Sequence, residues 1–181
     1  MSVYLIRHGQ SEFNAAYNEV DQIDPMIFDA PLTEKGIRQA KDTRVAVLDL
    51  GIKLVIASPL TRAIQTALHI FEGIAPITVR AGHHEYLIHS CDVGRSPAEL
   101  QMDFPALSFD HIDDIWWFQG PLNAVGVPVE PHEVFLKRVA NFTNDLTHIK
   151  DRPVAIIGHG DMFRELSGHQ MMNCEVHRYL E

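Results

Sequence analysis

The chain opens with MSVYLIRHGQSEFN (residues 1–14), in which a short apolar run ends abruptly at Arg7, His8 and Gly9. KLVIASP (residues 53–59) and PVAIIGHG (residues 153–160) show the same pattern, because each is a β-branched run of strand length that stops at Gly or Pro. PITVRAG (residues 76–82) reads as one more strand. The runs are almost continuously apolar rather than alternating, which is typical of strands covered on both faces of a sheet.

Helical patterns separate these runs, at residues 32–50, 59–71 and 131–149. In the last segment the apolar spacing predicts one core-facing stripe, made of Val134, Leu136, Val139, Phe142 and Leu146. Strands that alternate with helices favour an α/β fold. We therefore expect a three-layer α/β/α sandwich with a mostly parallel central sheet.

The length of 181 residues predicts a single domain over residues 1–181, with a loop-rich insertion at about 91–131. Five of the ten prolines fall in that insertion, which also holds Trp116, Trp117 and Phe118. One interpretation makes it a lid that excludes water and contacts the substrate. The simpler one is that the aromatic rings pack the loop onto the core.

Composition restricts the class of partner. The formal net charge of -9 argues against binding to nucleic acid or to an anionic membrane. No apolar run approaches membrane-spanning length, and Cys91 and Cys174 fit neither a disulfide framework nor a metal spacing, so we expect a cytoplasmic protein. The histidine-rich HHEYLIHSCD (residues 83–92) matches no usual zinc pattern, which favours surface or loop histidines and predicts no metal or cofactor.

Cationic and titratable side chains follow three of the predicted strands: Arg7 and His8, then Arg62, then His159. The carboxyl ends of parallel strands share one edge of a sheet, where helix N-termini also present free N–H groups. We therefore expect these four residues to meet there. The guanidinium fork matches phosphate oxygens in pairs, so the pattern predicts a phosphate site on an otherwise acidic protein.

Four segments, LIRHGQSEFN, PLTEKGIRQA, ASPLTRAIQTA and IIGHG, resemble in order and spacing the motifs of the histidine phosphatase superfamily, the phosphoglycerate mutase-like proteins. The resemblance implies a phosphoglycerate mutase-like fold, with His8 as the nucleophile that becomes phosphohistidine. It also implies that Arg7, Arg62 and His159 form the phosphate pocket. Asn14 matches a further phosphate contact, although a helix or turn cap is the alternative role.

Family members place a general acid in the segment that holds Glu85, and Asp92 is the fallback acid. Cofactor-dependent mutases usually carry an NERHYG-like motif in this region, which is missing here, so the resemblance implies hydrolysis. We expect a small phosphatase-type member: a metal-independent phosphomonoesterase acting on a small phosphorylated substrate. The alternatives are a non-catalytic phospholigand-binding regulatory protein and a phosphoglycerate mutase-like phosphotransferase. The pattern carries no prediction of oligomeric state.

Overall fold

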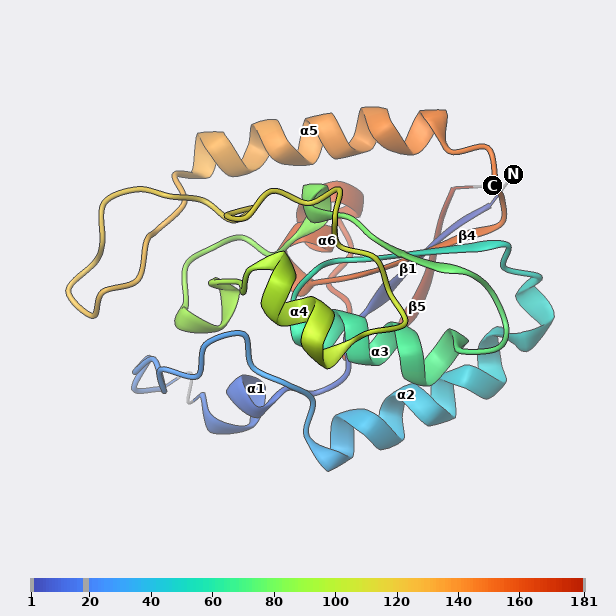
Figure 1. Ribbon diagram of the computed structural model, residues 1–181, viewed down its shortest axis with the longest axis horizontal. Coiled ribbons are helices and arrows are strands. Elements are labelled where there is room, and N and C mark those ends of the chain that lie inside the picture. The colour runs from blue at the N-terminus through green and yellow to red at the C-terminus, as the bar shows by residue number, and fades with distance from the viewer. Residues whose placement is uncertain (1, 18–19, 181) are drawn as a thin grey trace.

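The computed structural model describes residues 2–17 and 20–180, and a single five-stranded sheet lies at its centre (Figure 1). The strand order is β3-β2-β4-β1-β5, in which the first four strands are parallel and β5 is antiparallel to β1. The strands are β1 (Val3–Arg7), β2 (Leu54–Ala57), β3 (Ile77–Val79), β4 (Val154–Gly158) and β5 (Val176–Leu180).

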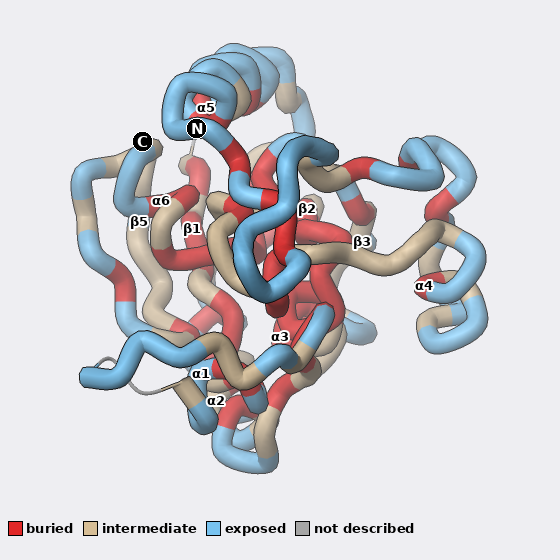
Figure 2. The backbone as a smooth tube through the Cα atoms, turned by 90° about the vertical axis from the view of Figure 1, so that its left-hand side faces the viewer, coloured by how far each residue is buried: buried red, intermediate tan, exposed pale blue. Residues whose placement is uncertain are grey.

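Helices cover both faces of this sheet, as continuously apolar strands require. They are α1 (Glu12–Ala16), α2 (Glu34–Val47), α3 (Thr61–Phe71), α4 (Pro97–Asp103), α5 (His132–His148) and α6 (Gly160–Ser167), with short 3-10 turns η1 (Leu48–Leu50), η2 (Ala81–His83) and η3 (Ser90–Asp92). One core cluster joins α2 and α3 to the sheet, and a second joins α5 and α6 to its other face. Figure 2 shows the buried strands enclosed between these layers. The predicted α/β fold with a mostly parallel sheet is confirmed.

Details of the predicted elements needed correction. The stripe of α5 consists of Phe135, Val139, Phe142 and Leu146, whereas Val134 and Leu136 are 39% and 37% exposed. Phe135 lies four residues before Val139, as a helical period requires, while its two sequence neighbours fall on the flanks. The strand expected over residues 76–82 ends at Val79, because the chain turns into η2 two residues later.

The segment 91–131 contains η3, α4 and irregular loops. Trp116 is only 8% exposed and belongs to a buried apolar cluster that includes Leu60 and Ile64 and that Trp117 packs against. The Trp116 indole N–H donates a hydrogen bond to the carbonyl of Arg95 at 2.9 Å. These contacts support the packing interpretation of the aromatic residues. Within the described part of the chain, no helix is long and apolar enough to cross a membrane.

Candidate active site

A cavity of about 250 Å³ opens at the carboxyl edge of the sheet. Five of the predicted site residues line it, namely Arg7, His8, Asn14, Arg62 and Glu85, and so does Asp92. The nucleophile candidate is supplied by the end of β1, Arg62 by the first turn of α3, and the opposite wall by the first turn of α6. Of the described residues, none between 93 and 131 lines this cavity.

His8 is 2% exposed, and its ring orientation is fixed by two hydrogen bonds. Nδ1 lies 2.7 Å from the carbonyl oxygen of Gly9, which only accepts, so Nδ1 carries the proton and Nε2 keeps its lone pair. The Nε–H of Arg62 donates to that Nε2 at 3.2 Å. Burial, followed by the charges of Arg62 and Arg7, lowers the pKa of His8 well below its ordinary value. The imidazole is therefore neutral, and its Nε2 electron pair accepts the Arg62 hydrogen bond.

The turn that carries His8 packs directly on the start of α2. A Cβ at Gly9 would lie 2.6 Å from the carbonyl oxygen of Gly36, and one at Gly36 would lie 2.1 Å from that of Gln10. Real Cβ atoms do not approach backbone so closely, so both positions need glycine. The Gly9 N–H also donates to the Thr66 hydroxyl on α3 at 3.1 Å. Two helices thereby hold the end of β1 in place.

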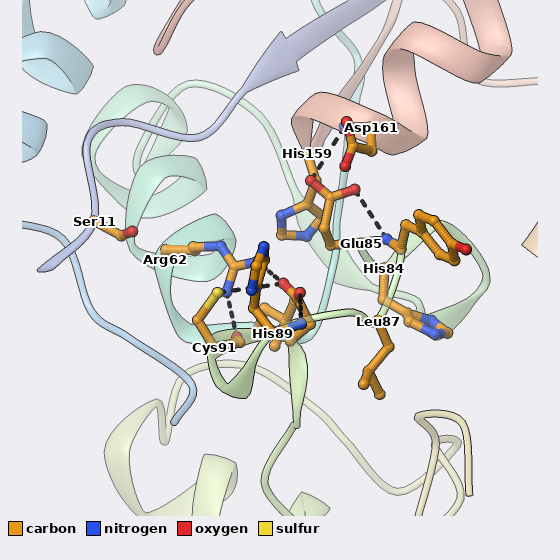
Figure 3. Close-up of polar contacts among 12 residues, drawn as sticks. Ser11, Arg62, His84, Glu85, Leu87, His89, Cys91, His159 and Asp161 are labelled. Atoms are coloured by element: carbon orange, nitrogen blue, oxygen red, sulfur yellow. Dashed lines mark hydrogen bonds and ion pairs between the residues drawn. The ribbon is translucent and has the colours of Figure 1, made fainter. Parts of the chain in front are cut away.

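Arg62 is held by a buried network. Its Nη2 pairs with Asp92 Oδ1 at 2.9 Å, and both side chains are 3% exposed. Its Nη1 donates to the carbonyl of Cys91 at 2.6 Å (Figure 3). Burial raises the pKa of Asp92, and the charge of Arg62 opposes that effect. Asp92, expected as the fallback acid, is thus the ion-pair partner that fixes the guanidinium beside His8.

Arg7 and His159 lie at the amino end of α6. Arg7 Nη1 donates to the carbonyl of Met171 at 2.7 Å, and a Cβ at Gly160 would lie 3.2 Å from its guanidinium carbon. His159 precedes α6 as its N-cap residue, with its ring centroid 5.2 Å from that of His8 and its Nε2 2.8 Å from the Ser58 hydroxyl. Burial, then Arg62, lowers the pKa of His159 well below its ordinary value.

Two nitrogen atoms of this group are buried without a hydrogen-bond partner: Arg7 Nε and His159 Nδ1. Buried polar atoms in folded proteins are normally paired, and unpaired ones call for an explanation. A guanidinium N–H and an imidazole nitrogen beside the amino end of a helix together favour an anionic ligand. Among the described residues, the other buried side-chain nitrogen atoms without a partner are His83 Nδ1 and His84 Nε2 in the core.

Glu85 lines the cavity and is hydrogen-bonded to the first turn of α6. Its carboxylate accepts hydrogen bonds from the backbone N–H groups of Asp161 and Met162, at 3.2 and 3.0 Å, and from its neighbour Tyr86 at 2.9 Å (Figure 3). Burial, followed by the negative charges of Asp92 and Asp161, raises the pKa of Glu85 to about 7. This side chain therefore exchanges a proton in the neutral pH range.

Asn14 closes the capping box of α1. Its side-chain oxygen accepts from the Ser11 N–H at 3.2 Å, while its own N–H donates to the Ser11 hydroxyl at 3.1 Å. The capping role named as the alternative is therefore present in the structure. Asn14 also lines the cavity, so its side chain lies within reach of a ligand there.

The clustered histidines were expected at surface or loop positions, and His83 lies in the turn η2 and His84 in the loop after it, but neither is on the surface. His83 and His84 are buried, the first stacked on Phe142 and the second edge-on to Trp116. Burial lowers the pKa of both to about 3, so they are neutral core residues. Over the described ranges, no group of three or more His, Cys, Asp and Glu residues is placed to hold a metal ion.

Several residues of the site were not predicted from sequence. They are Ser58 beside His159, Gly160 beneath Arg7, and Asp161 and Met162, whose backbone N–H groups hold Glu85. The GHG segment gave a usable signal, because a glycine directly after His159 allows close approach at a helix start. The backbone N–H groups of Asp161 and Met162 could not be predicted in this way, because every residue except proline has such a group.

Comparison with known proteins places the chain in a family. Residues 3–180 match the model of the histidine phosphatase superfamily (branch 1). The "Phosphoglycerate mutase-like protein 1" of Arabidopsis thaliana is 28% identical, in a match that covers 97% of this chain and 79% of that protein. A "Probable phosphoglycerate mutase GpmB" of Cronobacter sakazakii is 33% identical over 64% of this chain, but the match spans only 44% of that protein.

Solved structures give the same fold. An alpha-ribazole phosphatase from Shigella flexneri superposes with a TM-score of 0.65 at 17% identity, covering 97% of this chain and 88% of that one. A mycobacterial glucosyl-3-phosphoglycerate phosphatase does so with a TM-score of 0.62 at 20% identity and the same coverage. The family match spans nearly the whole chain, and the ordered motifs, the parallel sheet and the cavity at its carboxyl edge accord with it. The chain therefore belongs to the histidine phosphatase superfamily.

Proposed function

We propose that this protein is a phosphatase that hydrolyses a phosphomonoester through a phosphohistidine intermediate on His8. The arrangement of His8 carries the proposal: a neutral imidazole whose Nδ1 proton is held by Gly9, with Nε2 directed at Arg62. Glu85, with its pKa raised to about 7, lines the same cavity. A nucleophile, fixed positive charge and an acid thus meet at one small site, which is what phosphoryl transfer requires.

In the first step, the Arg62 Nε–H turns from His8 Nε2 to a phosphoryl oxygen, which frees the Nε2 lone pair. That pair attacks phosphorus, and the bond from phosphorus to the ester oxygen breaks. Arg7 and Arg62 stabilise the negative charge on the equatorial oxygen atoms. The proton of Glu85 goes to the leaving oxygen, which departs as a neutral alcohol. The phosphorylated imidazole keeps its Nδ1–H on the carbonyl of Gly9, which stabilises the positive charge that the ring acquires.

In the second step, the ionised Glu85 takes a proton from water, and the water oxygen attacks phosphorus. The bond from phosphorus to Nε2 breaks, so His8 regains its lone pair and inorganic phosphate is released. Glu85 is left protonated for the next turnover. A pKa near neutrality suits both halves of this cycle, because the same group must donate and then accept.

The environment of this reaction is also part of the proposal. The substrate is a small phosphorylated compound in the cytoplasm, and the reaction needs no metal ion, since two guanidinium groups supply the positive charge at the phosphoryl group. Binding to nucleic acid or to a membrane surface is disfavoured by the net charge of -9. Activity that survives exhaustive treatment with a chelator is the expected result, and activity restored only by a divalent cation would contradict this part.

The names of the relatives favour one alternative, transfer of the phosphoryl group to a second substrate instead of water. Transfer and hydrolysis share the phosphohistidine, so they differ only in the acceptor. Adding a primary alcohol such as glycerol during turnover separates them. The proposal predicts free phosphate as the product, and a phosphorylated acceptor as the main product would favour the transferase.

The test of the main proposal is to trap the intermediate. Wild-type protein is mixed with a radiolabelled aryl phosphate, quenched in alkali and analysed for alkali-stable, acid-labile phosphate on protein. We expect label on the peptide that contains His8, no label in His8→Ala, and normal labelling in the exposed control His148→Ala. Phosphate binding without turnover at any pH would favour the non-catalytic alternative.

A further inference from the structure

One wall of the active-site cavity is built of rings. Phe13 and Tyr17 on and just after α1 stack with their centroids 5.3 Å apart and their planes at 16°. The imidazole of His89 lies against both, at 5.3 Å from Phe13 and 5.0 Å from Tyr17. All three residues line the same cavity as His8 and Arg62, and we call them the ring wall.

The members of the ring wall differ in what they present to the cavity. Phe13 is 4% exposed and packs with Ala30 and Cys91, so it supports the wall from behind. Tyr17 is half-buried, and the His89 side chain is 30% exposed. These two rings therefore offer their surface to whatever occupies the cavity beside the phosphoryl position.

The positively charged side chains that line the cavity are enough to bind one phosphoryl group but not a second anion. Among its described lining residues the cationic side chains are Arg7 and Arg62, and Arg62 already pairs with Asp92. The imidazole of His89 lies 3.8 Å from the carboxylate of Asp24, which faces it from outside the cavity. Asp161 adds a further carboxylate to the cavity lining. A second carboxylate or phosphate on the substrate would meet no unused guanidinium or ammonium group and would be repelled.

We infer that the substrate is a monophosphate ester of an uncharged alcohol with a planar or apolar face, which packs on Tyr17 and His89 of the ring wall while its phosphoryl group lies at His8. This inference rests on the proposed function and adds the class of leaving group to it. Ring stacking favours such a group beyond simple burial, and an anionic leaving group gains no compensating cation. The phosphoglycerate that the relatives' names suggest is thus a poor substrate for this chain.

Three esters of primary alcohols test the inference, because the bond that breaks is the same in each: 2-phenylethyl phosphate, glycerol 1-phosphate and 3-phosphoglycerate. We expect kcat/KM to fall in that order, with about tenfold or more between the first and the last. Tyr17→Ala should lower kcat/KM for 2-phenylethyl phosphate about tenfold and leave glycerol 1-phosphate nearly unchanged. Phe28→Ala is the matched control, since Phe28 is an aromatic residue 50% exposed outside this cavity.

A gain of activity provides the complementary test. Gln170 lines the cavity at an exposed position, so Gln170→Lys adds a cation without disturbing the core. We expect this variant to raise kcat/KM for 3-phosphoglycerate at least several-fold and to leave that for 2-phenylethyl phosphate unimproved. Gln170→Met, which has similar length and no charge, serves as its control.

The failures of the two proposals are distinguishable. If phosphohistidine forms and 3-phosphoglycerate is hydrolysed as efficiently as 2-phenylethyl phosphate, the leaving-group inference is wrong and the proposed function stands. An equal effect of Tyr17→Ala on all three esters also contradicts the inference, because it would indicate a structural role for the ring. If no ester is hydrolysed and no phosphoenzyme forms, the proposed function fails and the inference fails with it.

Discussion

Replacing Glu85 by glutamine tests the acid in the proposed mechanism. The backbone N–H groups of Asp161 and Met162 hold the carboxyl group at 3.2 and 3.0 Å, and its pKa is raised to about 7. An amide of the same shape donates no proton to a departing alkoxide. General acid–base catalysis is typically worth about 10² to 10⁴ in rate, so we expect kcat for an alkyl phosphate to fall by that factor in Glu85→Gln.

The raised pKa of Glu85 also determines how the rate depends on pH. The first step needs Glu85 protonated, and a pKa of about 7 leaves roughly nine-tenths of it protonated at pH 6 and about one-tenth at pH 8. His8 stays neutral over this range, because its pKa is lowered well below its ordinary value. For a wild-type protein limited by the first step, kcat/KM for an alkyl phosphate should therefore fall about tenfold per pH unit above pH 7. Glu85→Gln should lack this basic limb.

The assay is steady-state release of phosphate between pH 5 and pH 9, with an alkyl phosphate and with p-nitrophenyl phosphate. The nitrophenolate leaves without a proton, so its first step should be much less affected by the substitution. Glu133→Gln, at an exposed position on α5, is the matched control. An unchanged basic limb in Glu85→Gln, or equal losses for the two esters in single-turnover formation of the phosphoenzyme, would refute the role of Glu85 as the acid.

Three further variants test the Arg62 ion pair, the packing of Arg7 on α6 and the role of Trp116 in the insertion. Asp92→Asn leaves the buried Arg62 without its carboxylate partner, so urea unfolding should show a loss of about 3 kcal/mol. Gly160→Ala sets a methyl group 3.2 Å from the Arg7 guanidinium carbon, so KM for a phosphate ester should rise about tenfold or more while the melting temperature changes little. Trp116→Ala should cost about 3 kcal/mol of stability in denaturant unfolding yet leave kcat of the folded protein near normal, because the indole packs beside α3 and does not line the cavity.

Each of these variants has an informative control or contrary outcome. Asp113→Asn, an exposed acid of the same segment as Trp116, should change neither stability nor activity. A Cβ at Gly82 meets only Phe142 at 3.7 Å, so Gly82→Ala should be tolerated where Gly160→Ala is not. A large drop of kcat in fully folded Trp116→Ala protein would favour the lid interpretation of the insertion.

The sheet and its main helices were predictable because their signals are local. Continuously apolar runs stopped by Gly or Pro predicted β1, β2 and β4, and the same edge-of-sheet argument brought Arg7, His8 and Arg62 into one cavity. Strand β5 was not predicted, since VHRYL alternates weakly and pairs at the sheet edge only through its antiparallel contact with β1. Helix α6 was not predicted either, because it is short and begins directly at the GHG turn.

The electrostatics of the site were harder to predict, because they depend on contacts between segments distant in sequence. The sequence predicts Asp92 as the fallback acid, but the ion pair that Asp92 makes with Arg62 joins residues 30 positions apart. His83 and His84 were expected in loops or on the surface, and only the tertiary packing of Phe142 and Trp116 makes them core residues. The raised pKa of Glu85 arises from its burial and from two carboxylates, one of which belongs to α6.

The central claim is that two displacements occur at phosphorus, the first by His8 and the second by water. The stereochemical course of hydrolysis tests this most directly, with a phosphate ester made chiral at phosphorus by oxygen isotopes and sulfur. Each in-line displacement inverts the configuration, so a phosphohistidine pathway predicts overall retention in the product. Overall inversion would mean that water attacks the ester directly, and it would contradict the account.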